Sequence, residues 1–376
     1  MKDKKNSVNS CCSPAPPKEP VEKSCCTDSS VESITGEESQ NITAVDSHWT
    51  ARDHWGRIKA RSGSFRNTYM VNPGLYKIGE PDEKAEVFVT ANYKFTFDIL
   101  RRELKGLDGW ILVLDTKGIN VWCAAGKGTF STDELVKRIK VTGLEGIVSH
   151  RRLILPQLGG VGIKAHVVKE QSGFHLHYGP VEASDIPAYL EAGRKATKEM
   201  RLVQFKWLDR LILTPIELNA VMKKFGIYAL LVLVYSGIDR SGILFDKAYH
   251  EGLLFIGLGL LSVLAGAFIT PVVLPFIPFR SFAIKGWIAG LAALIVFSFG
   301  TGMTAGMSPL LIIFSYIFFP LLSSYLALQF TGATTFTNMS GVVKELKYAF
   351  PLYKSGIVIS LLLLIAQKAL EWRIIL

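Results

Sequence analysis

The C-terminal part of the chain consists of long apolar stretches separated by short polar segments. An α-helix needs about 20 apolar residues to cross the hydrocarbon core of a bilayer. The two shortest stretches can lengthen into flanking sequence, because lysine and arginine side chains there can extend to the membrane surface. The pattern therefore predicts an all-α transmembrane bundle of about five helices, with apolar stretches at residues 225–238, 252–277, 286–303, 309–330 and 356–370.

Residues 70–201 follow a different pattern, in which short apolar runs alternate with amphipathic segments. The runs 87–90 and 110–115 are rich in β-branched residues, as buried parallel strands are. Ser131 or Thr132 can cap the helix that follows them. The alternation predicts a Rossmann-like α/β sheet whose ligand site lies beyond the carboxyl ends of the strands. We also expect strands at residues 147–149 and 162–168 and helices at 97–104 and 186–198.

Composition divides the chain into four parts. Residues 1–46 contain few large apolar side chains and cannot bury enough surface to offset the entropy of ordering, so we expect a disordered cytoplasmic tail. Residues 47–205 form the predicted α/β domain and residues 206–224 a basic juxtamembrane linker. Residues 225–376 form the predicted transmembrane domain.

The overall composition supports a membrane protein. Of the 376 residues 49% are hydrophobic, and the mean hydropathy of +0.28 is too high for a chain made of soluble domains alone. The formal charge is +10, with 28 basic and 19 acidic side chains in residues 47–224. No segment has the dense basic stripe with interleaved aromatic side chains that tracks a phosphate backbone, so we expect no nucleic-acid partner.

Basic residues also predict an orientation. Four basic residues within positions 206–224 precede the first apolar stretch, two follow the first stretch, two follow the second, none follow the third and three follow the fourth. By the positive-inside rule, the N-terminal domain lies in the cytoplasm and the C-terminus outside, in a multi-pass protein of the cytoplasmic (inner) membrane. Charged residues are nearly absent within the stretches, which favours an anchoring bundle over a transporter. A transporter stays an alternative, because prolines can break helices around a pathway, and four lie in or near these stretches: Pro271, Pro275, Pro278 and Pro320.

Four of the five cysteines, Cys11, Cys12, Cys25 and Cys26, lie in the tail, and Cys123 lies in the α/β domain. Adjacent cysteines form strained disulfides, so we do not expect a structural disulfide in the tail. Taken alone, Cys123 is most simply a small buried hydrophobe.

The segment around Cys123 does not match a phosphate-binding loop. Val121 stands where such a loop needs its first glycine, and Gly128 follows Lys127 where serine or threonine is required. A nucleophilic cysteine would need an adjacent base, and no local signature identifies one. The residues alone therefore do not decide between a structural and a reactive thiol.

The whole stretch, however, resembles a corrinoid-binding domain found in two protein families. One contains the large subunit of the corrinoid iron–sulfur protein of the acetyl-CoA pathway, and the other is the corrinoid protein of microbial mercury methylation (the HgcA family). The segment NVWCAAGK followed by about five membrane spans resembles the second family, because the iron–sulfur subunit lacks a cysteine in this motif. The resemblance is carried by NPGLYKIGEP (72–81), VTANYKFTFDILR (89–101), WILVLDTKGINVWCAAGKGTFST (110–132), VSHRRLILPQLGGVGIKAH (148–166) and YGPVEASDIPAYL (178–190).

This resemblance implies a cobalamin or related corrinoid cofactor, with Cys123 as axial cobalt ligand and catalytic residue. A thiolate donates electron density and weakens the cobalt–carbon bond on the opposite face, and Lys127, one helical turn further on, would favour the thiolate. The usual histidine-ligand signature is incomplete, since Ala51 replaces its glycine after Asp46 and His48 and we expect no strand before it. The implied cap motif comprises Asn120, Val121, Trp122, Cys123, Ala124, Ala125, Gly126 and Lys127.

Further corrin-binding residues are expected where strands end. Asn120 can equally be a turn residue, and His150, which we expect after a third strand, can equally be a surface or core histidine. The expected rim comprises Thr90, Asn92, Tyr93, His150, Pro156 and Gln157.

For the activity, the resemblance implies a membrane-anchored methyl carrier, a cobalamin-dependent methyltransferase that passes a methyl group from methyl-Co(III) corrinoid to Hg(II) and forms methylmercury. The implied partners are a methyl donor of the methyltetrahydrofolate type and, as electron donor, a ferredoxin-like protein with two 4Fe-4S clusters. Two alternatives stay open: a membrane-tethered carrier with a non-mercury acceptor, and a corrinoid receptor or transporter without methyl transfer.

The tail cysteines suggest a route for the metal. Vicinal thiols bind Hg(II) and exchange it by thiolate attack, and a coil of about 40 residues spans roughly 35 Å. Cys11, Cys12, Cys25 and Cys26 could therefore capture Hg(II) and pass it towards the corrinoid. Binding of zinc or another soft metal, or no metal role, is an equal alternative.

Overall fold

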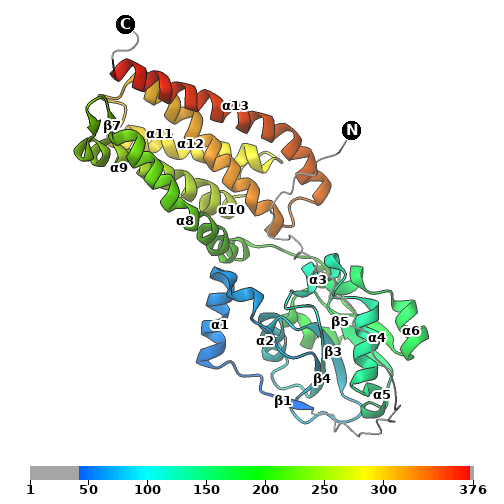
Figure 1. Cartoon of the computed structure of the whole chain (residues 1–376). Helices are drawn as coiled ribbons and strands as arrows, with labels where there is room; N and C mark the ends of the chain where they lie inside the picture. The colour runs from blue at the N-terminus through cyan, green and yellow to red at the C-terminus, as the bar shows by residue number, and fades with distance from the viewer. Residues whose placement is uncertain (1–41, 373–376) are drawn as a thin grey trace, which may run out of the picture. The chain divides into compact units, whose positions relative to one another are not determined.

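The computed structural model describes residues 42–372, which form two compact units, residues 42–204 and 205–372 (Figure 1). The first unit has a mixed α/β fold with a largely parallel sheet, and the second is mostly helical. This arrangement confirms the predicted fold class. The four tail cysteines lie outside the described residues.

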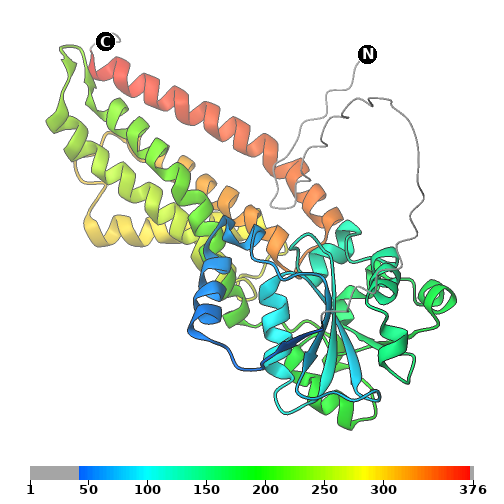
Figure 2. The ribbon, with the colours of Figure 1, turned by 60° about the horizontal axis from the view of Figure 1, so that its bottom comes forward.

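The first unit is built on a six-stranded sheet with the order β1-β2-β4-β3-β5-β6. Figure 2 shows helices on both sides of this sheet. β3 runs parallel to β4 and β5, and β5 runs parallel to β6. β2 is antiparallel to β4, and the edge strand β1 is parallel to β2. The strands are β1 Thr43–Val45, β2 Gly74–Ile78, β3 Glu86–Ala91, β4 Gly109–Leu114, β5 Arg152–Leu155 and β6 His175–Tyr178.

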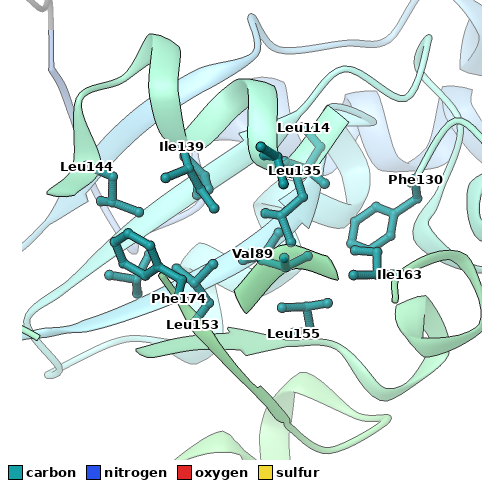
Figure 3. Close-up of a cluster of buried hydrophobic side chains, with 14 of the residues drawn as sticks. Val89, Leu114, Phe130, Leu135, Ile139, Leu144, Leu153, Leu155, Ile163 and Phe174 are labelled. Atoms are coloured by element: carbon teal, nitrogen blue, oxygen red, sulfur yellow. The ribbon is translucent and has the colours of Figure 1, made fainter. Parts of the chain in front are cut away.

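Helices cover both faces of this sheet. Alternate residues of the central strands point to opposite faces, so Val89 and Leu112 join one hydrophobic cluster and Phe88 and Ile111 another. The first cluster, part of which is shown in Figure 3, packs against α3 Val121–Lys127, α4 Thr132–Val141, α5 Leu144–Ile147 and α6 Ala165–Ser172. The second packs against α2 Lys94–Glu103 and α7 Ile186–Glu191. The remaining elements of the unit are α1 Ala51–Ser62 and the 3-10 helices η1 Ser64–Asn67, η2 Gln157–Gly162, η3 Ala183–Asp185 and η4 Glu199–Arg201.

A network of ion pairs joins α1 to α2. The Asp53 carboxylate pairs with Lys94 Nζ and with Arg101 Nη2, each at 2.8 Å. Asp98 pairs with the same two cations, at 2.7 Å from Lys94 Nζ and 2.8 Å from Arg101 Nε. Thr50 and Asp53 form a reciprocal cap at the start of α1. Because Asp53, Asp98 and Arg101 are buried, the network holds α1 in place through charges that have little access to water.

The predicted strands 87–90 and 110–115 are confirmed as β3 and β4, and Ser131 caps α4 by accepting a hydrogen bond from the Glu134 amide at 3.3 Å. The predicted strand 147–149 is wrong, because Ile147 is the last residue of α5 and the Val148 side chain is buried in the first hydrophobic cluster. The predicted strand 162–168 is also wrong: this segment ends η2 and begins α6. The helix predicted at 186–198 stops at Glu191.

The second unit contains five helices that are long and apolar enough to cross a membrane. This confirms the predicted all-α bundle and is compatible with a multi-pass membrane protein. A short hairpin, β7 Ile238–Asp239 and β8 Gly242–Ile243, joins the first two spans. The helices are α8 Trp207–Gly237, α9 Phe245–Val263 with the π-helix η5 Leu264–Ile269 and α10 Thr270–Val272, α11 Phe282–Thr301, α12 Pro309–Gln329 with η6 Phe330–Ala333, and α13 Met339–Glu371.

Residues 207–224, predicted as a linker, are part of α8. Lys223 and Lys224 are exposed on that helix and do not interrupt it. The predicted disordered tail, residues 1–46, also ends too late in the sequence, because Thr43–Val45 form β1.

Close contacts between small residues hold the bundle together. A Cβ atom on Gly266 would lie 2.3 Å from the Ser323 carbonyl oxygen, and one on Gly290 would lie 2.5 Å from Ser323 Cβ. Ser323 Oγ also donates a hydrogen bond to the Gly286 carbonyl oxygen at 2.8 Å. Such close packing with short hydrogen bonds is typical of helices associating in lipid, where no hydrophobic effect drives them together.

Candidate functional site

Three parallel strands of the first unit end at one edge of the sheet. β3 is followed by Asn92, β4 by Asp115, and β5 by Pro156. Because β3 is parallel to both β4 and β5, these residues leave the sheet on the same side. Open α/β sheets bind their ligands at this carboxyl edge.

Cys123 lies at this edge, in the first turn of α3. Asn120 is the N-cap of the helix, and its Oδ1 accepts a hydrogen bond from the Cys123 amide at 2.9 Å. Gly128, with a φ of 77°, ends the helix in a left-handed conformation that favours glycine. Cys123 is half-buried, and Lys127 is exposed one turn further on. The cap thus fixes the backbone that carries the thiol.

The cap motif divides into an inner and an outer side. Val121, Ala124 and Ala125 are buried in the first hydrophobic cluster, so they support α3 from beneath. Trp122, Gly126 and Lys127 face outwards beside the half-buried Cys123. This division leaves the outer side of α3 available to a ligand.

Asn92 organises the loop between β4 and α3. Its Oδ1 accepts hydrogen bonds from the amides of Thr116 and Gly118, at 3.1 and 2.9 Å, and from Thr116 Oγ1 at 2.9 Å. Its Nδ2 donates to Asp115 at 3.3 Å. Asn92 is 4% exposed, so it positions the loop from below instead of presenting a free amide to a ligand. The sequence placed Asn92 at the rim but did not indicate this role, because all its partners lie more than 20 residues away.

η2 packs closely against α3. A Cβ atom on Gly162 would lie 2.1 Å from the Phe130 carbonyl oxygen and 3.1 Å from Ala125 Cα. A Cβ atom on Gly159 would lie 2.5 Å from the Phe130 ring. Glycine at these two positions therefore lets the segment after β5 approach the segment that contains Cys123.

Three other predicted rim residues are not exposed at the carboxyl edge. His150 precedes β5 and so lies at the amino edge, where its Nε2 is 2.9 Å from the Ala85 carbonyl oxygen and its Nδ1 accepts from the Arg152 amide at 3.2 Å. Thr90 is 2% exposed within β3, and Tyr93 is 6% exposed at the start of α2. These three residues support the fold and offer no exposed surface at the carboxyl edge.

The incomplete histidine signature also lies elsewhere. β1 directly precedes Asp46, so the expectation of no strand there is wrong. However, Val45 pairs with Ile78, and Ile78 pairs with Gly109 at the start of β4, so His48 follows the opposite edge of the sheet. His48 Nδ1 lies 3.0 Å from Asp46 Oδ1, and both side chains are exposed.

Comparison with known proteins relates this unit to a family. Residues 64–190 match the family described as CO dehydrogenase/acetyl-CoA synthase delta subunit. The acetyl-CoA decarbonylase/synthase complex subunit gamma of Methanopyrus kandleri is 34% identical over 128 residues, 34% of this chain and 27% of that protein. The corrinoid/iron-sulfur protein large subunit of Moorella thermoacetica is 29% identical over 124 residues, 32% of this chain and 27% of that protein. The α/β unit contains a domain related to corrinoid proteins.

The match is limited to this corrinoid-related domain. The chain spans about a quarter of the length of the curated relatives it matches. The matched residues include the whole carboxyl edge and Cys123, whereas α1 and the five apolar helices lie outside them.

The residues at the carboxyl edge fit a corrinoid. Cofactor sites combine apolar surface with a few polar groups, and here Trp122 is 44% exposed and Val161 of η2 is 84% exposed. Gln157 Oε1 is buried and has no hydrogen-bond partner among the described residues. Cys123 adds a soft sulfur donor of the kind that binds transition metals. Among residues 42–372, no group of three or more His, Cys, Asp or Glu side chains could hold a metal ion.

Proposed function

We propose that this protein is a membrane-anchored corrinoid methyl carrier that transfers a methyl group to Hg(II) and forms methylmercury. The observation that carries the proposal is the half-buried Cys123, held by the Asn120 cap at the carboxyl edge of a domain related to corrinoid proteins. Mercury as the acceptor rests on the resemblance of NVWCAAGK, followed by membrane spans, to the mercury-methylation family.

Cobalamin or a related corrinoid would supply a methyl group that can leave cobalt with its bonding electron pair. Cys123 would hold the cofactor through its sulfur and donate electron density to the metal, and the positive charge of Lys127 would favour the thiolate form. Trp122 and Val161 would cover the apolar ring and exclude water, while Gln157 Oε1 would accept a hydrogen bond from a side-chain amide of the cofactor. The exposed side of the site would admit Hg(II), a soft electrophile that can accept this methyl group.

The proposed carrier needs two further partners, a methyl donor and an electron-donating protein. A methyltetrahydrofolate-type donor would provide the methyl group, and a ferredoxin-like protein with two 4Fe-4S clusters would return the cofactor to its reduced state. The excess of 28 basic over 19 acidic side chains in residues 47–224 suits docking of an acidic ferredoxin. The five apolar helices would anchor the carrier in the cytoplasmic membrane, with the α/β unit in the cytoplasm and the C-terminus outside.

Two measurements on the full-length protein in detergent test this proposal. The absorption spectrum of protein purified after loading with cobalamin reports whether a corrinoid is bound and whether sulfur is the ligand beneath cobalt. Methyl transfer from the loaded protein is then measured with Hg(II) and, in parallel, with a thiol acceptor. Methylmercury as the main product supports the proposal. Transfer to the thiol alone identifies a carrier with another acceptor, and a bound corrinoid that never loses its methyl group identifies a receptor or transporter.

A further inference from the structure

The α/β unit carries an exposed face that combines basic and large apolar side chains. On α1 and η1, Trp55 is 58%, Ile58 52% and Phe65 38% exposed, although each could pack in a core. Arg52 and Lys59 are exposed among them, and Lys59 Nζ lies 5.6 Å from the Trp55 ring and 5.8 Å from the Phe65 ring. We call the surface formed by these five residues the α1 face.

The segment around the α1 face is almost entirely basic. Residues 52–66 contain Arg52, Arg57, Lys59, Arg61 and Arg66, and Asp53 is the sole acidic residue between positions 47 and 79. Asp53 points inwards and is neutralised by Lys94 and Arg101, so it does not reduce the positive charge of the surface. A helix with basic side chains around exposed tryptophan and isoleucine is typical of elements that lie in a membrane interface.

We propose that the α1 face binds the surface of an anionic bilayer. The lipid is available because the same chain carries five helices able to span a membrane, and only residues 202–206 connect η4 to α8. A short connection of this kind gives the second contact a high effective concentration, so modest affinity is enough. The α1 face lies outside residues 64–190 except for Phe65, so it is an addition to the corrinoid-related domain and does not depend on the proposed activity.

Binding of the α1 face to a bilayer would also affect the position of the carboxyl edge of the sheet. Residues after η1 lie along the carboxyl edge: the Val71 amide donates to the Asn92 carbonyl oxygen at 3.0 Å, and a Cβ atom on Gly118 would lie 2.6 Å from Met70 Cγ. Gly118 is in the loop that leads to α3. A membrane-bound α1 face would therefore bring the side of the carboxyl edge formed by β3 and β4 close to the lipid surface.

Lipid crosslinking in the full-length protein tests the proposal. A photoreactive p-benzoylphenylalanine is placed at Ile58 and, as a matched control, at Val141, which is 61% exposed at the end of α4. Each protein is reconstituted in nanodiscs of phosphatidylcholine, with or without phosphatidylglycerol, and lipid adducts are counted by mass spectrometry. Since each basic side chain near an anionic surface is worth about fivefold in the binding equilibrium, Arg52→Glu with Lys59→Glu should reduce the adduct at position 58 by more than tenfold.

The expected result is a lipid adduct at position 58 that requires phosphatidylglycerol, weakens at high salt and exceeds that at position 141. The double charge reversal Lys137→Glu with Lys140→Glu on α4, where both lysines are exposed, should leave it unchanged. Equal adducts at both positions, or adducts that do not depend on phosphatidylglycerol, would overturn the proposal. An adduct to a second copy of the chain or to an added ferredoxin, in place of lipid, would also overturn it and identify a protein-binding face. Because the readout needs no corrinoid, failure here leaves the proposed methyl carrier untouched.

Discussion

At the scale of single residues, Asn92 controls a site that it does not line. Asn92→Ala would leave the buried amides of Thr116 and Gly118 without their acceptor, so we expect a loss of about 1–3 kcal/mol in the free energy of unfolding. Corrinoid occupancy should also fall, because the loop that loses these hydrogen bonds leads directly into α3. Chemical denaturation and the cofactor-to-protein ratio measure the two effects. Asn92→Asp keeps an acceptor oxygen and should lose less stability and less cofactor. If both variants are as stable and as fully loaded as the native protein, the loop does not need Asn92.

Substitutions at Cys123 distinguish a cobalt ligand from a structural cysteine. Cys123→Ala should cost less than about 1 kcal/mol of stability, because the side chain is half-buried, yet it should abolish methylmercury formation. Cys123→His should retain part of the corrinoid, since imidazole also binds cobalt, while methyl transfer to Hg(II) falls. Product analysis and the absorption spectrum report the two outcomes. Thr129→Ala, at a half-buried position in the same segment, serves as the control. Full activity of the alanine variant would end the thiolate-ligand hypothesis.

At the scale of elements, the contact of η2 with α3 shapes the carboxyl edge. Gly162→Ala places a methyl group 2.1 Å from the Phe130 carbonyl oxygen, so η2 and α3 must separate. We expect a loss of about 1–3 kcal/mol in stability together with a loss of corrinoid occupancy.

Gly126→Ala tests the outer side of α3 without a packing clash. Apart from the two flanking residues and the backbone of the helix itself, no atom lies within 4 Å of the added methyl group, and alanine should stabilise the helix by about 0.5–1 kcal/mol. If the outer side of α3 faces the corrin ring, this variant should nevertheless bind less corrinoid. A variant that is more stable and fully loaded would place the ring elsewhere.

The attachment of α1 to α2 should depend on acid. Burial opposes the ionisation of Asp53, but hydrogen bonds from Lys94 and Thr50 outweigh it and hold the pKa of this carboxyl below its ordinary value. A carboxyl with a lowered pKa contributes stability above its unfolded pKa of about 4, and this contribution is lost as the pH falls further. The protection factors of the α1 amides, which compare measured exchange with the intrinsic rate at each pH, should therefore fall below about pH 4.

The variant Asp53→Asn checks this assignment. Its α1 amides should be less protected at neutral pH, because Lys94 and Arg101 lose part of their counter-charge, and their protection factors should change little with acid. Asp133→Asn, at an exposed position of α4, should retain the acid dependence of the native protein. An Asp53→Asn variant with the native pH profile would assign the effect to another group.

The elements that could be predicted from sequence are those whose residues all share one environment, such as a fully buried strand. Residues 110–114 of β4 are all buried apolar side chains, so the run indicates a central strand without further information. Ile147 and Val148 look similar over a shorter length, but they close α5 and fill the core, while the true strand begins at Arg152. Short apolar runs do not distinguish these cases, because tertiary packing decides between them. The tight approach of Gly162 to Phe130 and the hydrogen bonds of Asn92 depend on distant partners and leave no local pattern.

At the scale of the whole molecule, hydropathy predicted the number of long apolar helices but placed the start of the first one too late. α8 begins at Trp207 and continues through Lys223 and Lys224, because apolar residues before the lysine pair keep helical spacing and both charges face outwards. The sequence also separated a corrinoid-related unit from the apolar helices, since the two patterns differ in period and length. Orientation in the membrane rests on the distribution of lysine and arginine alone and stays a prediction.

The last prediction concerns the cysteines outside the described residues. We expect a chain that begins at Ile42, and so keeps β1, to methylate Hg(II) as fast as the full chain when the metal is in excess. When Hg(II) is scarce and competing thiols are present, the shortened chain should be slower, because it lacks the vicinal thiols Cys11–Cys12 and Cys25–Cys26 that could capture the metal. Initial rates of methylmercury formation over a range of Hg(II) concentrations measure the difference. A full-length variant with these four cysteines changed to serine controls for the loss of the segment itself. It should reproduce the slow rate at low Hg(II), and identical rates for all three proteins would mean that the tail cysteines take no part in delivering mercury.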